Sequence, residues 1–174
     1  GDARLSAVVV VARQRLIGVE EEVWREEYMR VDRQEFYTGI PLIDNQHDTY
    51  LDLVDRLFEV CHKPHIDKAK ADEAVMEVFA YAIEHFDAEE ALMDSISYRG
   101  LEAHRTKHDE FRDRIDRVSA SRHEGISPED QLVHLTRWLV EWFCEQTQTY
   151  DKSLASYLKK QGHTSPNKMN RQRP

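Results

Sequence analysis

Apolar residues recur at steps of three and four along four long stretches of the chain, the spacing that places side chains on one face of an α-helix. No stretch alternates strictly between apolar and polar residues, as a half-buried β-strand would. The breaks between the stretches hold Pro64, Gly100 and Pro128. We therefore predict an all-α protein, an antiparallel up-and-down four-helix bundle. Its helices are expected over about 44–62, 67–95, 101–118 and 128–160.

The first 30 residues carry a separate pattern, in which apolar residues alternate steps of four and three as in a heptad repeat. Its members are Leu5, Val9, Ala12, Leu16, Val19 and Val23. Two interpretations stay open: an additional N-terminal helix that lies against the bundle, or a coiled-coil linker to a fused signalling domain, which could also pair two copies of the chain. We assign 1–30 to this extension or linker, 31–160 to the bundle and 161–174 to a flexible polar tail.

Composition narrows the range of functions. The chain has 174 residues, of which 40% are hydrophobic, enough for one bundle core. Its net charge of −9 disfavours nucleic acid as a partner. The longest apolar run, 7–12, is far shorter than the roughly 20 residues of a membrane helix, so we expect no membrane insertion by this segment. Cys61 and Cys144 lie in apolar patterns without metal-type spacing, as reduced thiols of a cytoplasmic protein would.

The predicted helices also carry residue types that bind metals, one set on each helix. The set consists of His47, the pair His85 and Glu89, the pair His104 and His108, and Asp151. Taken singly, each has a simpler explanation, such as a core histidine bonded to a carbonyl or a surface His–Glu pair. Together, four imidazoles and two carboxylates would be costly to bury unless they share a metal. This donor set favours iron, manganese or zinc over calcium or magnesium.

At this point the sequence resembles the hemerythrin family in its bacterial form. The matching pieces span roughly 35–160 and touch all four predicted helices. They are the run GIPLIDNQH over 39–47, His85-Phe86 with Glu89-Glu90 and Leu92-Met93, His104 with His108, and Asp151 with Leu154 and Tyr157. Taken jointly these pieces are specific, whereas a single HxxxE or HxxxH motif would be weak.

The resemblance implies a non-haem centre of two iron ions, completed by an oxo or hydroxo bridge. Both carboxylates, Glu89 and Asp151, would bridge the irons. His47 and His85 would hold the iron that binds dioxygen. The other iron would be held by the HxxxH pair of the third helix together with one further histidine from the last helix.

That further histidine is absent from this chain. Gln146 stands five residues before Asp151, where the family pattern places it. Because an amide oxygen is a weaker donor to iron than imidazole, Gln146 is predicted to be either a weak ligand or an open position. Thr147 replaces an apolar residue and, with Phe86 and Phe143, is expected to line the ligand pocket. We hypothesise that the centre oxidises faster than is usual in the family, or that the weakened site is only partly occupied.

Three functions remain open. The heptad pattern favours a sensory domain of a signalling protein, which binds dioxygen or responds to redox state and passes the change through residues 5–23. A free-standing carrier or store of oxygen or iron would not require that pattern. An enzyme that reacts with peroxide or nitric oxide would need acid–base groups, for which only Glu90, Glu145 and Tyr150 are at hand. We expect dioxygen or another small oxidant as the partner.

Overall fold

The computed structural model describes residues 32–61, 63, 65–120 and 128–162. The predicted N-terminal helix, the turn over 121–127 and nearly all of the predicted tail lie outside the described residues. The main helices are α3 (Pro41–Cys61), α4 (Lys68–Ser95), α5 (Leu101–Ala120), α6 (Pro128–Glu145) and α7 (Lys152–Lys160). Two short elements complete the described part, a 3₁₀ turn η1 (Arg33–Phe36) and a π-helical segment η2 (Gln146–Asp151).

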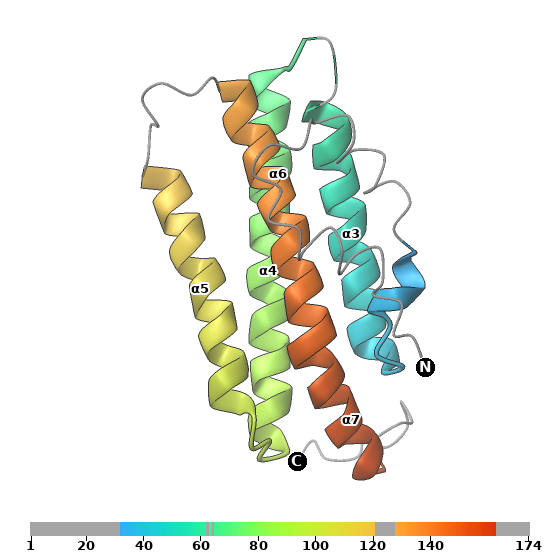
Figure 1. The fold of residues 1–174 in the computed structure, drawn as a ribbon. Helices are drawn as coiled ribbons and strands as arrows, with labels where there is room; N and C mark the ends of the chain where they lie inside the picture. The colour runs from blue at the N-terminus through green and yellow to red at the C-terminus, as the bar shows by residue number, and fades with distance from the viewer. Residues whose placement is uncertain (1–31, 62, 64, 121–127, 163–174) are drawn as a thin grey trace, which may run out of the picture.

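The helices stand side by side and run alternately up and down (Figure 1). Helices α3, α4 and α5 form three columns, and α6, η2 and α7 together form the fourth. The described residues contain no strand, so the predicted all-α bundle is confirmed. No helix in the described part of the chain combines the length and apolar character needed to cross a membrane.

Local hydrogen bonds explain where two of the helices begin. The Asp67 carboxylate caps α4 by accepting from the backbone N–H groups of Ala69 and Lys70 at 3.1 and 3.3 Å. Helix α3 starts at Pro41, three residues earlier than the sequence predicts, because proline is favoured in the first turn of a helix. The preceding turn passes through Gly39 at a φ of 74°, and the Asp44 carboxylate holds its N–H at 3.0 Å.

The fourth column differs from the sequence prediction. We expected one regular helix over 128–160, but the backbone changes to π-helical winding at Gln146 and returns to α-helical winding at Lys152. A π-helical turn holds one more residue than an α-helical turn, and such segments occur mostly at functional sites. This change lies between two apolar regions of the bundle.

The core consists of two hydrophobic clusters with a polar layer between them. The larger cluster includes Val54, Phe79, Phe111 and Leu139, one from each column. The smaller cluster closes the other end of the bundle and consists of Ile40, Ile43, Met93, Leu154, Ala155 and Leu158. His47, Glu89 and Asp151 each fall between a member of one cluster and a member of the other along their columns. The apolar clusters therefore seal the polar layer from both ends.

Candidate metal centre

The polar layer contains all six metal ligands that the sequence predicts. None of these residues is more than 5% exposed. Their ligand atoms form two groups, within each of which all atoms lie within 4.8 Å of one another. The first group is His47, His85 and Asp151, and the second is Glu89, His104 and His108. The four columns thus converge on two adjacent three-residue sites.

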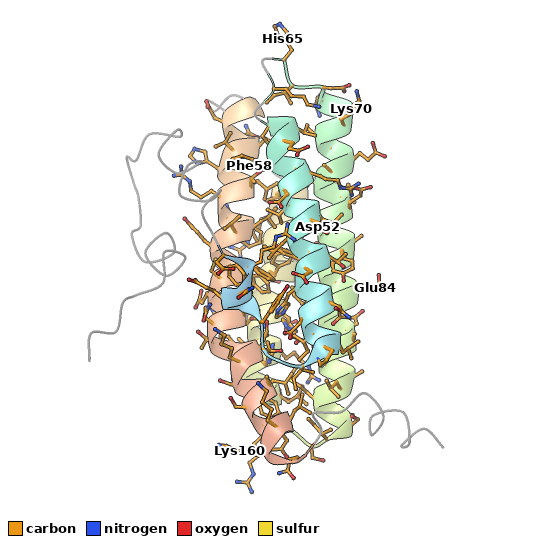
Figure 2. All side chains as sticks on the ribbon, turned by 90° about the vertical axis from the view of Figure 1, so that its right-hand side faces the viewer. Asp52, Phe58, His65, Lys70, Glu84 and Lys160 are labelled. Atoms are coloured by element: carbon orange, nitrogen blue, oxygen red, sulfur yellow. The ribbon has the colours of Figure 1, made fainter. Side chains whose placement is uncertain are left out.

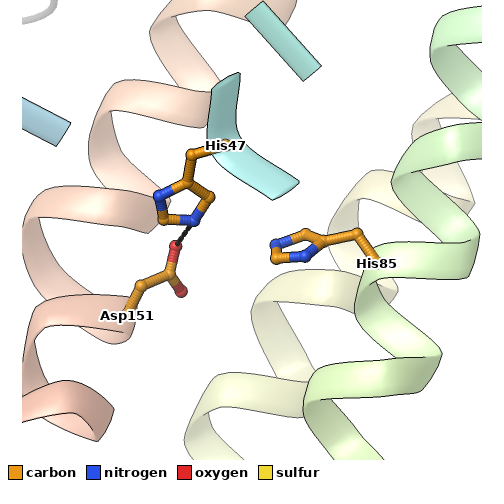
Figure 3. Close-up of side chains that lie close together, drawn as sticks. All are labelled: His47, His85 and Asp151. Atoms are coloured by element: carbon orange, nitrogen blue, oxygen red, sulfur yellow. Dashed lines mark ion pairs between the residues drawn. The ribbon is translucent and has the colours of Figure 1, made fainter. Parts of the chain in front are cut away.

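The first group joins α3, α4 and η2. His47 Nε2 lies 3.1 Å from Asp151 Oδ2, and His85 faces this pair from α4 (Figure 3). Each histidine is oriented by a contact at its other ring nitrogen. His47 Nδ1 lies 3.3 Å from the carbonyl oxygen of Phe36, and His85 Nδ1 lies 3.1 Å from Gln46 Oε1. Because these oxygens accept a hydrogen bond from Nδ1–H, they leave the Nε2 lone pair of each ring free to bind a metal.

The second group joins α4 and α5. Glu89 Oε2 lies 3.2 Å from His104 Nε2 and 3.6 Å from His108 Nε2. His108 donates from Nδ1 to Glu90 Oε1 at 2.9 Å, so its Nε2 also points a lone pair at the site. The i,i+4 spacing of the two histidines puts both rings on one face of α5, as the sequence predicts.

The two carboxylates lie between the groups. Asp151 belongs to the first group through His47, yet its Oδ1 is 3.0 Å from His104 Nε2 of the second. Glu89 belongs to the second group, yet its Oε2 is 3.7 Å from His85 Nε2 of the first. Each carboxylate therefore faces histidines of both groups, which is the placement that two bridging ligands require.

Electrostatics keep both carboxylates ionised in spite of their burial. Burial opposes the charged form of Asp151, but the His104 and His47 rings that face it hold its pKa well below the usual range. Burial and the Asp151 charge oppose ionisation of Glu89, yet His85 and the two histidines of α5 lower its pKa to about 2. Conversely, burial alone would lower the pKa of His104, but the two carboxylates raise it to about 9.

The layer contains more lone pairs than protein donors can satisfy. Within the described residues, both oxygens of Glu89 and Oδ2 of Asp151 make no hydrogen bond of good geometry. Leaving ionised oxygens without such partners in a sealed interior is costly, and a cation removes that cost. The imidazole lone pairs that point into the same layer complete a donor set for two metal ions. The residues present therefore fit a two-metal centre.

The π-helical segment brings Gln146 and Asp151 together. An α-helix turns about 100° per residue, so residues five apart would point in clearly different directions. In this structure Gln146 Nε2 lies 3.0 Å from Asp151 Oδ1, because the wider π turn re-aims both side chains into the layer. The five-residue spacing was the one signal in the sequence that could have predicted this break in the helix.

Two rings and a hydroxyl border the layer, at the positions expected to line a ligand pocket. Phe86 stacks on His108 with ring centroids 4.1 Å apart, and Phe143 meets the ring of His47 edge-on at 5.2 Å. Thr147 is fully buried, and its hydroxyl has no hydrogen-bond partner within the described residues. Their role as a pocket stays a prediction.

Sequence reasoning did not assign the residues that orient the ligands. Gln46 and the carbonyl of Phe36 hold histidines of the first group, while Glu90 holds His108 of the second. Gln46 and Glu90 each adjoin a ligand in sequence, and that adjacency was the available signal. Glu145 is exposed and pairs with Lys107 instead of entering the layer.

The fold and the layer together define a helical bundle that binds cations through histidine and carboxylate side chains. The chain belongs to the family described as hemerythrin HHE cation binding domain, which matches residues 38–150. Membership in this family indicates a non-haem di-iron centre.

Curated relatives agree with this assignment. The chain is similar to a bacteriohemerythrin of Pseudomonas aeruginosa (strain LESB58), with 33% identity over 104 residues that cover 59% of this chain and 66% of the relative. That alignment spans slightly less than two thirds of the relative. A bacteriohemerythrin of Clostridium acetobutylicum is 27% identical over 127 residues, which cover 70% of this chain and 98% of the relative. No solved structure matches the chain significantly.

Proposed function

We propose that this chain is a di-iron domain that responds to dioxygen or to redox state and serves as the sensory domain of a signalling protein. His47, His85 and Asp151 would hold one iron, and the group on α4 and α5 would hold the other. When bound, the irons would supply the electrons for reversible binding or reduction of dioxygen. The protein supplies the rest: fixed imidazole orientations, two ionised carboxylates and a layer sealed between apolar clusters.

The observation that carries the sensory role is a set of backbone contacts between the centre and residues 35–38. The carbonyl of Phe36 faces Nδ1 of the ligand His47 at 3.3 Å. The carbonyl of Glu35 accepts from Gln148 Nε2 at 2.9 Å and from Lys152 Nζ at 2.8 Å. Gln148 lies in η2, between Gln146 and Asp151, and Lys152 directly follows Asp151. Residues 35–38 thus contact α3 through His47, and they contact the segment that carries Asp151 through Gln148 and Lys152.

This segment, which we call the clasp (residues 35–38), also lies where a signal would leave the bundle. Lys159 of α7 donates to the carbonyl of Thr38 at 2.5 Å, so three of the four positions of the clasp are held by the fourth column or by His47. η1 lies across α3 and the fourth column (Figure 2). The clasp follows closely on the heptad pattern of residues 5–23, and a shift of η2 would move it through these bonds.

Substituting Lys152 tests this route. The full chain is loaded with iron(II) without oxygen, and backbone hydrogen exchange over the clasp is measured before and after oxygen is admitted. We expect exchange there to change with oxygen in the native chain. Lys152→Met should keep the oxygen-dependent change in visible absorption and lose most of the exchange change, because Lys152 Nζ joins η2 to Glu35.

Lys160→Met is the matched control, because Lys160 is an exposed lysine of the same helix (Figure 2). It should behave as the native chain does. Oxygen-dependent absorption without any change of exchange in the native clasp would contradict a sensory role and favour a carrier or store. Absence of an oxygen-dependent spectrum in the iron-loaded chain would contradict the proposed function altogether.

A further inference from the structure

We propose that Gln146 is itself a metal ligand, through its side-chain oxygen, and that the second ion is not left with an open position. The inference rests on the proposed di-iron site and concerns the one residue at which this chain departs from the family pattern. Gln146 is 2% exposed and projects from the first turn of η2 into the layer. It therefore has no access to bulk water that could satisfy its amide.

The amide of Gln146 occupies the place of a ligand atom. Its terminal nitrogen, as placed, lies 2.5 Å from His104 Nε2, 3.1 Å from His108 Nε2 and 3.0 Å from Asp151 Oδ1. Ligand atoms held at about 2.1 Å from one metal and at right angles to each other lie about 3 Å apart. The Gln146 amide thus stands within 3.1 Å of three other donors, the close grouping expected around one metal ion.

Glu89 completes the same set. Its Oε2 lies 3.2 and 3.6 Å from the Nε2 atoms of His104 and His108, and His104 Nε2 is 3.0 Å from Asp151 Oδ1. Five protein atoms from three elements, α4, α5 and η2, therefore gather with contacts of 2.5–3.6 Å, which are typical of a coordination shell. A water molecule in an open position would have to share the space that the amide already fills.

A shared cation would select the oxygen. The His108 Nδ1–H bond to Glu90 leaves a lone pair on His108 Nε2, and this atom and Asp151 Oδ1 both face the amide. Without a metal they would accept from the amide N–H groups, but a cation at the common centre would take both lone pairs, and only the amide oxygen has a lone pair to add to them. A separation of 2.5 Å from His104 Nε2 is shorter than a normal N–H···N hydrogen bond. A half-turn of the amide group exchanges its nitrogen and oxygen without moving the rest of the side chain. After that half-turn, Oε1, now buried without a partner among the described residues, points its lone pair at the common centre.

With an amide oxygen as ligand, the second ion still binds, but its donor set differs from that of the first ion. The first group offers two imidazoles and a carboxylate, whereas the second would combine two imidazoles with carboxylate and amide oxygens. Neutral oxygen donors bind first-row ions less tightly than imidazole and suit manganese(II) better. The second position is therefore expected to exchange its ion faster than the first.

The test removes the oxygen while keeping the shape of the side chain. Gln146→Leu, Gln146→Glu and the native full chain are titrated without oxygen with iron(II), and separately with cobalt(II), whose visible spectrum reports coordination number. The native chain and Gln146→Glu should bind two ions per chain. Gln146→Leu should bind the second ion at least about tenfold to 100-fold more weakly, with a cobalt spectrum of lower coordination number. Thr136→Val is the matched control, since it removes a buried hydroxyl of the same column that lies outside the layer and donates to the Leu132 carbonyl, and it should keep two ions.

The outcomes separate this inference from the proposed function. Two ions with native affinity in Gln146→Leu would overturn the ligand assignment and leave the di-iron proposal standing. One ion or none in the native chain would overturn both. If Gln146→Leu fails to fold, as judged by its circular dichroism, the cobalt spectrum decides through Gln146→Glu: a spectrum changed by the charged oxygen supports ligation, and an unchanged one opposes it.

Discussion

At the scale of single residues, Glu90 shows how the bundle supports a ligand without binding metal itself. Its carboxylate accepts from His108 Nδ1 at 2.9 Å and is held by Arg105 and Arg112 at 3.1 and 3.0 Å. Partial burial raises the pKa of Glu90, but the hydrogen bonds from His108 and the two arginines outweigh it and lower the pKa. Glu90 therefore stays anionic, fixes the His108 ring and makes its Nε2 a stronger donor.

Removing this support should weaken the second site and spare the fold. Because residues that orient metal-binding histidines are typically worth 10-fold to 100-fold in affinity, Glu90→Ala should weaken binding of one iron(II) per chain by about that factor. Anaerobic titration measures the effect. Glu102→Ala is the control, because Glu102 also binds Arg105 but lies on the exposed surface. Equal affinities in the two variants would contradict the assigned role of Glu90.

At the scale of elements, the π-helical segment is the feature that adapts a regular bundle to its site. Regular α-helical winding over 128–160 would satisfy the backbone equally well, so the extra residue in the turn has no evident structural benefit. What the segment provides is the meeting of Gln146 and Asp151, five residues apart, at 3.0 Å. It also places Gln148 against the clasp.

Deleting one exposed residue of this segment tests what sets the positions of Gln146 and Asp151. Without Thr149 the two residues would stand four apart, a spacing that an α-helix places on one face, so regular winding would hold both side chains in the layer. The metal-free variant should therefore keep its helical circular dichroism and a thermal midpoint no lower than native, and it should still bind two iron ions per chain. Thr149→Ala keeps the chain length and should match the native protein. A deletion variant that binds fewer than two ions would contradict this and show that the π winding itself is needed.

At the scale of the whole molecule, the bundle is two apolar clusters with a polar layer between them. The apolar stripes were enough to predict four helices and their antiparallel order, because amphipathic helices must bury one face against one another. The i,i+4 pairs on α4 and α5 were predictable for the same geometric reason. Their combination into two groups with shared carboxylates came from the resemblance to a family.

Other features could not be predicted because they depend on packing between elements far apart in the sequence. The clasp carbonyls, for example, meet Lys152 and Lys159 more than a hundred positions later. No local pattern at Glu35 or Thr38 indicates such a contact. The place of the Gln146 amide likewise depends on the π winding, which the apolar periodicity of the last helix conceals.

The measurement that tests the central claim most directly is a metal count with a visible spectrum. The full chain is purified without oxygen and supplied with iron(II), the bound iron is counted per chain, and the spectrum is recorded before and after oxygen is admitted. Two irons per chain and a new visible absorption that depends on oxygen are the predicted result. One iron or none, or two irons whose spectrum is indifferent to oxygen, would contradict the account.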